Sequence, residues 1–441
     1  METLQSKRQI ATLYDFDWEH FMAEYWDQAP VLIKGYHKET IISEEDFFTL
    51  FKLQSEQILA GKRAGLTLYD KNRVSLSGEN ASIRFRTGIE DYLPHNKFAD
   101  LRDYLNWLAS VDRFNEFCVY ADSPHTYKHI WEKMKGQFRE IFRHTNMSPH
   151  GMNTDLFIGN YERTNFGAHK DQLSNFMFLV FGTRRMLLWS EHTWKKVLNN
   201  PDNNKLVVQN YEPFREEAIV VEMEAGDMLY WPSEYWHVGE NDGTLSGSIN
   251  IDYVESDSLT EVENVIGNSL TKIIRQESAN HTKNYDRDYF HFEEDESAQM
   301  SLPDNITERY KLLIRHFANP QLFTFFLESE WLRKISAMGF IKGLQPRETP
   351  AGVSAAAVVR SDKDYPVYYK AIDDKLVLAH SGVLKVLDLE DGLIRLVEHL
   401  NKGGNIPASA LYSRFMAEFA SRADFDNALL HFYEIHAIEL G

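Results

Sequence analysis

The chain has 441 residues, too many for one ordinary domain, so two or three domains are expected. Its formal charge of −19 disfavours generic nucleic-acid binding, because phosphate backbones would be repelled. No stretch approaches the roughly 20 apolar residues of a membrane span, and the start lacks the pattern of a signal peptide. The single cysteine, Cys118, excludes a disulfide framework, so we expect a cytoplasmic protein.

The net negative charge of the chain can be explained in two ways. It favours a basic partner, such as a Lys/Arg-rich protein or peptide, and it also serves plain solubility.

The first 150 residues mix helical patterns with short strands. Helical patterns surround a short predicted strand at 29–36, APVLIKGY. The pattern from 83 to 115 is mixed, and 127–145 is predicted to form a helix.

Between 151 and 253 the sequence changes to short β-rich runs separated by Gly, Asn, Asp and Pro. The predicted strands are 155–161, 175–181, 185–189, 205–211, 218–224, 227–232 and 247–253. Many short strands with turn signals between them are typical of an antiparallel sandwich or barrel.

After residue 253 the strand pattern gives way to helices. Apolar spacing predicts helices within 258–276 and 307–339, with a polar, acidic segment between them that we expect to be a mobile loop. A linker with Pro and Gly follows at 344–352. The remaining residues form a small unit with predicted strands at 365–372 and 375–388 and predicted helices at 391–401, 408–420 and 425–440.

These boundaries predict three domains. They are a barrel with N-terminal helices (1–255), a helical region expected to form a dimer (256–343) and a small C-terminal domain (353–441). The apolar helices before the last unit have a simpler alternative role as core.

The segment NFGAHKDQLSNFMFLVFGTRRMLLW (165–189) places His169 and Asp171 two residues apart. Roughly two or three His-x-acid triplets are expected by chance. The triplets that start at His37 and His291 have no β-rich surroundings. In a strand, residues i and i+2 share a face, so His169 and Asp171 can aim an imidazole and a carboxylate at one point.

A third metal ligand is predicted on a later strand. In EAGDMLYWPSEYWHVGEN, a turn, a strand and Pro232 precede His237 at the start of the next strand. Two histidines and one carboxylate form the facial triad of non-haem Fe(II) oxygenases, which leaves three iron positions open. Two of these can take an α-keto acid and one can take O₂. Taken alone, His237 has the ordinary alternative of a packed core histidine.

A turn at FGT (181–183) predicts a hairpin that returns Arg184 or Arg185 to the barrel interior. Strand alternation lets only one of the two face inward. Arg184 is the candidate for the distal carboxylate of 2-oxoglutarate, which a planar guanidinium binds bidentately. A surface charge is the alternative for either arginine.

The segments HKDQLSNFMFLVFGTRRMLLW and GDMLYWPSEYWHVGEN…GSINIDY resemble the Jumonji-C class of 2-oxoglutarate oxygenases. The similarity is strongest to the cupin-like ribosomal oxygenases and to the asparaginyl hydroxylase of a hypoxia-responsive transcription factor. Residues 21–36 are similar to the entry segment of the cupin-like proteins. The resemblance implies an α+β fold: a double-stranded β-helix (cupin or jelly-roll) barrel with flanking helices, then a helical region and a small winged-helix-like C-terminal domain.

The resemblance also implies roles for six residues. Fe(II) would be bound by the catalytic residues His169, Asp171 and His237, and Arg184 would hold the 2-oxoglutarate C5 carboxylate. Asn175 and Asn250 match asparagines that line the cofactor pocket of the asparaginyl hydroxylase branch.

One position departs from that branch, which has a threonine three residues before the first histidine. Here the residue is Phe166. We expect either that Thr164 or Tyr161 supplies the missing hydroxyl or that the co-substrate lies differently.

The resulting hypothesis is a hydroxylase of an amino-acid side chain in a protein or peptide, which converts 2-oxoglutarate and O₂ to succinate and CO₂. The alternatives are the same chemistry on a free amino acid, a small metabolite or a tRNA base, and a non-catalytic cupin scaffold. The C-terminal unit has no Lys/Arg-rich helix, so we expect it to dock a protein or peptide, or to act as scaffolding, rather than to bind nucleic acid. A homodimer and no membrane partner are expected.

Overall fold

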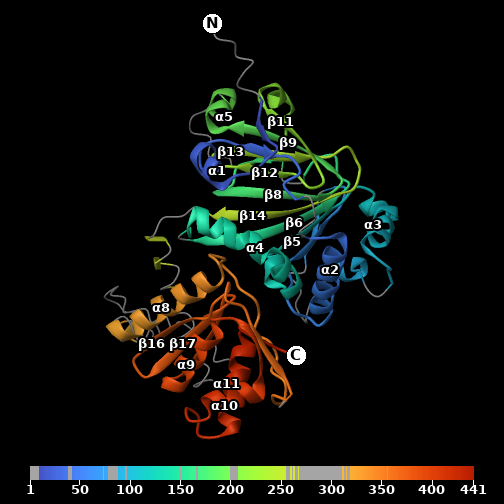
Figure 1. Cartoon of the computed structure of the whole chain (residues 1–441). Helices are drawn as coiled ribbons and strands as arrows, with labels where there is room; N and C mark the ends of the chain where they lie inside the picture. The colour runs from blue at the N-terminus through green and yellow to red at the C-terminus, as the bar shows by residue number, and fades with distance from the viewer. Residues whose placement is uncertain are drawn as a thin grey trace, which may run out of the picture. The chain divides into compact units, whose positions relative to one another are not determined.

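The computed structural model forms two compact units, Met1–Glu255 with Met338–Gln345, and Ser256–Ala337 with Pro346–Gly441 (Figure 1). It describes residues 9–37, 42–72, 74–77, 88–94, 97–148, 150–164, 167–198, 207–254, 318–354 and 356–441, and single positions between 259 and 314.

The first unit contains a nine-stranded sheet in the order β1-β2-β12-β8-β14-β6-β5-β3-β4. The β1–β2 pair is parallel and every other pair is antiparallel. The strands are β1 (Ala11–Leu13), β2 (Val31–Ile33), β3 (Leu66–Tyr69), β4 (Ser75–Ser77), β5 (Cys118–Asp122), β6 (Gly151–Gly159), β8 (Leu173–Phe181), β12 (Met228–Trp231) and β14 (Ser246–Val254).

A smaller antiparallel sheet faces it, in the order β10-β7-β13-β9-β11. Its strands are β7 (Ala168–His169), β9 (Thr183–Ser190), β10 (Val207–Val208), β11 (Ile219–Glu224) and β13 (Tyr235–Glu240). Side chains from both sheets share one apolar core, which includes Leu179 from the large sheet and Leu188 from the small one. Two facing sheets with a common core confirm the predicted barrel class.

Helices cover the face of the large sheet that points away from this core (Figure 1). They are α1 (Trp18–Glu24), α2 (Glu44–Leu59), α3 (Leu101–Ser110) and α4 (Lys128–Thr145), the last close to the predicted bounds. Phe21 of α1 packs its ring against Phe176 of β8 and Tyr230 of β12. Because one face of each strand packs on helices, alternate side chains are left to build the barrel interior.

The predicted hairpin between 175–181 and 185–189 is wrong. Strand β8 pairs with β12 and β14, whereas β9 pairs with β11 and β13, so the chain crosses from one sheet to the other at this point. Gly182 makes the crossing with φ of 77°, and a Cβ there would lie 2.3 Å from the carbonyl oxygen of Leu245. Only glycine tolerates this conformation and this approach of the backbone.

The predicted strand at 205–211 is mostly wrong as well. Positions 205 and 206 lie outside the described residues, and within 207–211 only β10, Val207–Val208, is a strand. The buried ring of Tyr211 instead packs beneath the small sheet with Trp189 and Trp194, next to the short helix α5 (Glu191–Leu198). Packing on the outer face of the small sheet therefore overrides the β-rich pattern of this run.

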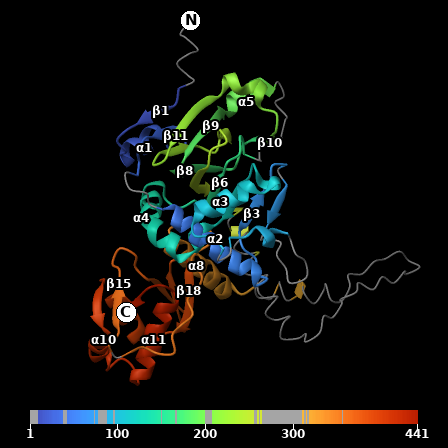
Figure 2. The ribbon, with the colours of Figure 1, turned by 90° about the vertical axis from the view of Figure 1, so that its right-hand side faces the viewer.

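The second unit contains two three-stranded sheets, β16-β17-β18 and β19-β15-β20, and Figure 2 shows its β15, α10 and α11. Helix α8 packs on the first sheet through Leu332 and the strand residues Val377 and Ala379. The elements are α8 (Pro320–Ser336), β15 (Val358–Ser361), β16 (Tyr368–Ile372), β17 (Lys375–His380), β18 (Val383–Asp388), α9 (Asp391–Leu400), β19 (Gly404–Pro407), α10 (Ala408–Phe415), α11 (Arg422–Glu434) and β20 (Glu439–Leu440).

Two predictions for this unit need correction. The run 375–388 is a hairpin rather than one strand, because Ser381 and Gly382 both have positive φ and reverse the chain. The predicted helix 425–440 ends at Glu434, and His436, with φ of 63°, leads into β20. The three-domain division and the winged-helix likeness stay predictions, and most of the expected dimer region lies outside the described residues. Within the described chain, no helix has the length and apolar character that crossing a membrane requires.

Candidate metal centre

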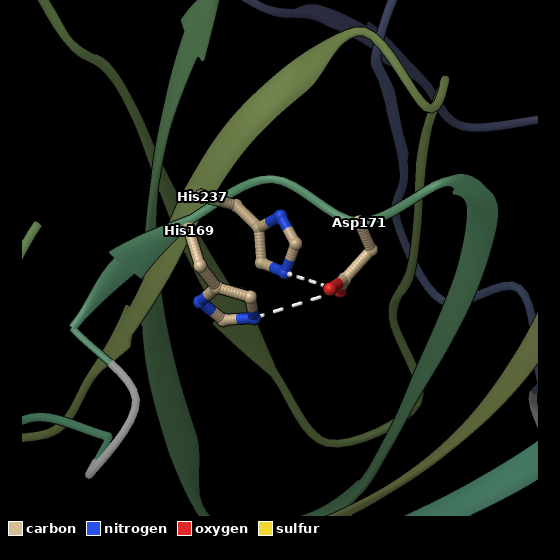
Figure 3. Close-up of side chains that lie close together, drawn as sticks. All are labelled: His169, Asp171 and His237. Atoms are coloured by element: carbon tan, nitrogen blue, oxygen red, sulfur yellow. Dashed lines mark ion pairs between the residues drawn. The ribbon is translucent and has the colours of Figure 1, made fainter. Parts of the chain in front are cut away.

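The three predicted ligands meet inside the barrel (Figure 3). His169 of β7 lies directly opposite His237 of β13, and their ring centroids are 4.2 Å apart. The Nε2 atoms of His169 and His237 lie 3.5 Å and 3.6 Å from Oδ2 of Asp171. Donors that each bind one ion at about 2.0–2.2 Å are separated by about 3–4 Å, so this spacing fits a single metal ion.

Asp171 reaches the site by a different route from the predicted one. Strand β7 ends at His169, so Asp171 lies in the connection to β8 rather than on the same strand face. The strand-alternation argument was therefore wrong for this pair, although the two side chains do converge. The loop turns the carboxylate back towards the histidines.

Both imidazoles are oriented with Nδ1 towards a backbone carbonyl and Nε2 towards Asp171. Nδ1 of His169 lies 2.9 Å from the carbonyl oxygen of Gly167, and Nδ1 of His237 lies 3.4 Å from that of Tyr235. A carbonyl oxygen only accepts, so Nδ1 donates in both rings. Nε2 of each ring points towards Asp171 and can bind a metal ion once it carries no proton.

The electrostatics favour an ionised carboxylate beside a neutral His237. Burial alone would raise the pKa of Asp171, but the hydrogen bond from His169 and the charges of both imidazoles lower it to about 2. Burial and the neighbouring His169 lower the pKa of His237 to about 4. For His169, burial opposes the charged form, but the hydrogen bond to Asp171 and its charge outweigh it and raise the pKa.

Arg184 faces the barrel interior on the same side of β9 as Met186, and only 2% of its surface is exposed. Nη1 donates to Oγ of Ser248 at 2.6 Å, and Nη2 donates to Oγ of Ser246 at 3.1 Å. Its Nε has no partner among the described residues. Arg185 faces outward and pairs with Glu222, so only one arginine points inward, as expected.

The buried guanidinium of Arg184 has no carboxylate partner in the described chain, where its hydrogen bonds go to neutral hydroxyls. A buried charge without a counter-charge is costly. The site around Arg184 therefore suits an anion.

One cavity of about 720 Å³ contains the whole constellation. All six predicted site residues line it: His169, Asp171, His237, Arg184, Asn175 and Asn250. The Oδ1 atoms of Asn175 and Asn250 are buried and have no hydrogen-bond partner in the described part of the chain. These atoms are acceptors that remain available to a ligand or substrate.

The two candidate hydroxyls differ in position. Thr164 lines the cavity, and its buried Oγ1 has no partner among the residues described. The ring of Tyr161 instead lies 5.8 Å from the Arg184 guanidinium, outside the lining. Phe166 lies outside the described residues.

Sequence reasoning missed an acidic pair in the same cavity, Asp155 of β6 and Asp252 of β14. Burial raises the pKa of Asp155 to about 6, while burial and the charge of Asp155 raise that of Asp252 well above its ordinary value. A charged residue inside an apolar strand, as in TDLFIG and SINIDY, is the signal that could have drawn attention to each.

Comparison with solved structures supports the fold. A crystal structure of ycfD from Escherichia coli matches with a TM-score of 0.51 at 14% identity, over 97% of this chain and 99% of that one. A structure of the same E. coli protein, a ribosomal oxygenase in complex with cobalt and 2-oxoglutarate, has a TM-score of 0.49 at 13% identity, over 97% of this chain and 99% of that one. At such identity the likeness is one of fold alone. No curated protein sequence matches the chain.

The family assignment rests on the barrel segment. Residues 19–258 match the family model described as the cupin-like domain, which covers more than half of the chain. This range includes every strand of the two sheets of the first unit except β1, and all three candidate metal ligands. The chain therefore belongs to the cupin-like domain family.

Proposed function

We propose that this protein is an Fe(II)- and 2-oxoglutarate-dependent dioxygenase that hydroxylates an amino-acid side chain in a protein or peptide. The observation that carries the proposal is the shared cavity of the two-histidine, one-carboxylate group and Arg184. This donor set is typical of non-haem Fe(II) oxygenases. Membership of the cupin-like family supports it.

The donor set fits the metal. His169 and His237 would each bind Fe(II) through Nε2, and Asp171 would bind through a carboxylate oxygen. Two neutral nitrogens and one negative oxygen leave coordination positions for the co-substrate and O₂. When bound, iron and 2-oxoglutarate supply the oxidation that converts O₂ and 2-oxoglutarate to succinate and CO₂ and inserts one oxygen atom into a substrate C–H bond.

The surrounding residues bind and orient the co-substrate. Arg184 would hold its distal carboxylate, and Ser246 and Ser248 accept hydrogen bonds that fix the direction of the guanidinium. A guanidinium held in advance loses less freedom on binding. The hydroxyl of Thr164 can donate to the same carboxylate, in the role that Phe166 cannot fill.

Apolar side chains restrict water near the reacting atoms. Trp231 packs its ring 5.0 Å from that of His237, and Met177 and Met186 also line the cavity. Exclusion of water strengthens the electrostatic interactions in the site and protects the oxidation from side reactions.

A protein or peptide substrate follows from the motif resemblance and from the acidic charge of the chain. A free amino acid, a metabolite or a tRNA base would use the same residues. A non-catalytic scaffold would not require the complete ligand set, which this chain retains. The cytoplasmic location and the homodimer stay predictions.

The test is succinate formation by the purified protein supplied with Fe(II) and 2-oxoglutarate, first without substrate. We expect turnover that is lost in His169→Ala and retained in His144→Ala, a histidine on α4. Fe(II)- and 2-oxoglutarate-dependent oxygenases can require bound substrate before they turn over. Anaerobic binding of Fe(II) and 2-oxoglutarate is therefore also measured, through the visible charge-transfer band of the complex. Absence of both turnover and the band would overturn the proposal.

A further inference from the structure

The wall of the cavity opposite the histidines is built by the large sheet. Asp155 on β6 lies in register with Asn250 on β14, and Asp252 on β14 lies in register with Asn175 on β8. All four side chains line the cavity. Alternation along neighbouring strands therefore gathers two carboxyls and two carboxamides on one interior surface, which we call the acidic recess.

The acidic recess has more hydrogen-bond acceptors than the described side chains supply donors for. The amide Nδ2 of Asn175 donates to Oδ1 of Asp252, and the hydroxyl of Tyr120 donates to Oδ1 of Asp155 at 2.8 Å. The Oδ1 atoms of Asn175 and Asn250 are left without a partner among the described residues, although these side chains are only 4% and 5% exposed. Buried acceptors of this kind require a donor from elsewhere.

The described chain supplies no cation to this recess. One arginine and one lysine line the cavity, but Arg184 is held by serines and Lys170 pairs with Glu191, while His169 pairs with Asp171. Outside the cavity lining, Lys342 is bound to Asp122 and Ser123. Asp155 and Asp252 therefore have no cationic partner among the described side chains.

We propose that Asp155 and Asp252, together with the amide oxygens of Asn175 and Asn250, bind a cationic side chain of the substrate that carries several N–H donors, a guanidinium or an alkylammonium group. This inference rests on the proposed function, because the recess shares its cavity with the metal ligands. A guanidinium has five donors and an ammonium has three, which suits a surface made of acceptors.

The recess exchanges a proton for the substrate cation. Asp155 and Asp252 are hydrogen-bonded to each other, which requires one proton between them. Burial raises the pKa of both groups above the ordinary value. The charge of Asp155 raises the pKa of Asp252 further, whereas the hydrogen bond between the two carboxyls lowers the pKa of Asp155. Entry of a cation favours two ionised carboxylates, so the shared proton leaves to solvent.

Neighbouring groups also change the pKa values of Asp155 and Asp252. Asp122 on β5 and Asp171 in the metal site oppose its ionisation by their negative charge, and Tyr120 on β5 donates a hydrogen bond to Asp155. Rising pH removes the shared proton. Affinity for a cation should therefore increase with pH, and affinity for a neutral isostere should not.

Calorimetry with a matched pair of small probes tests the inference. N-acetyl-arginine amide and its neutral isostere N-acetyl-citrulline amide are titrated into the Co(II)- and 2-oxoglutarate-loaded full chain at pH 6 and pH 8. Two buffers with different heats of ionisation count the protons released. We expect the cation to bind at least about tenfold more tightly at pH 8, with proton release. The amide of N-acetyl-lysine separates guanidinium from ammonium recognition.

Substitutions locate the binding to the recess. Asp155→Asn and Asp252→Asn should each abolish the preference for the cation and its dependence on pH. The control is Asp122→Asn, which removes one nearby carboxylate that lies outside the cavity lining and should keep the preference. If either isosteric variant fails to fold, Asp252→Ser gives a second test of the same carboxyl.

The outcomes separate this inference from the proposed function. Equal or absent binding of both probes, with Co(II) still bound by the triad, overturns the acidic recess alone. Loss of Co(II) and 2-oxoglutarate binding in the wild type overturns the proposed function. A second equivalent of Co(II) that disappears in Asp252→Asn would mean that the recess binds metal, and the inference would be wrong.

Discussion

The two walls of the cavity differ in the charge of the groups that they can bind. The small sheet, called the metal wall here, supplies His169, His237 and Arg184, which we propose bind a metal and an anion. The large sheet supplies Asp155 and Asp252, which remain without a cation from the described chain. One barrel thus combines residues proposed to carry out the metal-dependent oxidation with a second wall that is proposed to recognise the substrate. The difference suggests that the two can be altered separately.

The largest effect is expected on the metal wall. His237→Ala removes one of two nitrogen donors and leaves a buried gap beside Trp231. We expect metal affinity and succinate formation to fall on the order of 1000-fold, because the remaining two donors no longer form a facial triad. Metal titration and turnover measure this. Retention of turnover within a few fold would exclude His237 as a ligand.

The arginine pair allows a matched comparison on adjacent residues. Arg184→Met should weaken 2-oxoglutarate binding by about 100-fold, since truncating one partner of a buried charge pair costs about 2–5 kcal/mol. Arg185→Met removes an outward-facing group that pairs with Glu222 and lies 3.8 Å from Glu240, outside the cavity lining, and should leave affinity unchanged. Anaerobic titration of the charge-transfer band gives both affinities. Similar losses in the two variants would contradict the assignment of Arg184.

On the wall built by the large sheet, called the acidic wall here, removing a carboxyl should increase the stability of the protein. Because the folded state raises the pKa of Asp155 and Asp252, it binds more protons than the unfolded chain, and stability falls as pH rises from about 4 through the raised pKa values. Asp252→Asn removes one of the two charges and keeps the hydrogen bonds. We expect its melting temperature to exceed that of the wild type by about 2–6 °C at pH 8, with the gain vanishing near pH 4. A variant that is less stable at pH 8 would mean that the carboxyls are compensated.

The smallest effect is expected at Thr164, the proposed replacement for the threonine that the related branch has at the position of Phe166. Thr164→Val keeps the shape and removes a hydroxyl that lines the cavity, so 2-oxoglutarate affinity should fall by about 3–10-fold, the equivalent of one hydrogen bond. Tyr161→Phe changes a hydroxyl outside the lining and should have less effect. If Tyr161→Phe lowers 2-oxoglutarate affinity more than Thr164→Val does, Tyr161 rather than Thr164 supplies the hydroxyl.

Local pattern predicted the metal wall better than the acidic wall. The β-rich runs, the turn before Arg184 and the placement of His237 at a strand start could all be read from neighbouring residues. The acidic pair could not, because Asp155 and Asp252 are almost a hundred residues apart and meet only through the register of β6 and β14. The sheet crossing at Gly182 was missed for the same reason, since strand partners are not local.

By itself, the sequence determined which residues alternate into the barrel, because the side-chain period of a strand is a local property. It also supplied the types of metal ligand and the inward arginine. Only the tertiary structure decided that His169 stands opposite His237 and that the loop returns Asp171 to them. It also decided that two buried carboxyls share one surface. Strand pairing fixes these distances, and pairing depends on hydrogen bonds between segments far apart in the chain.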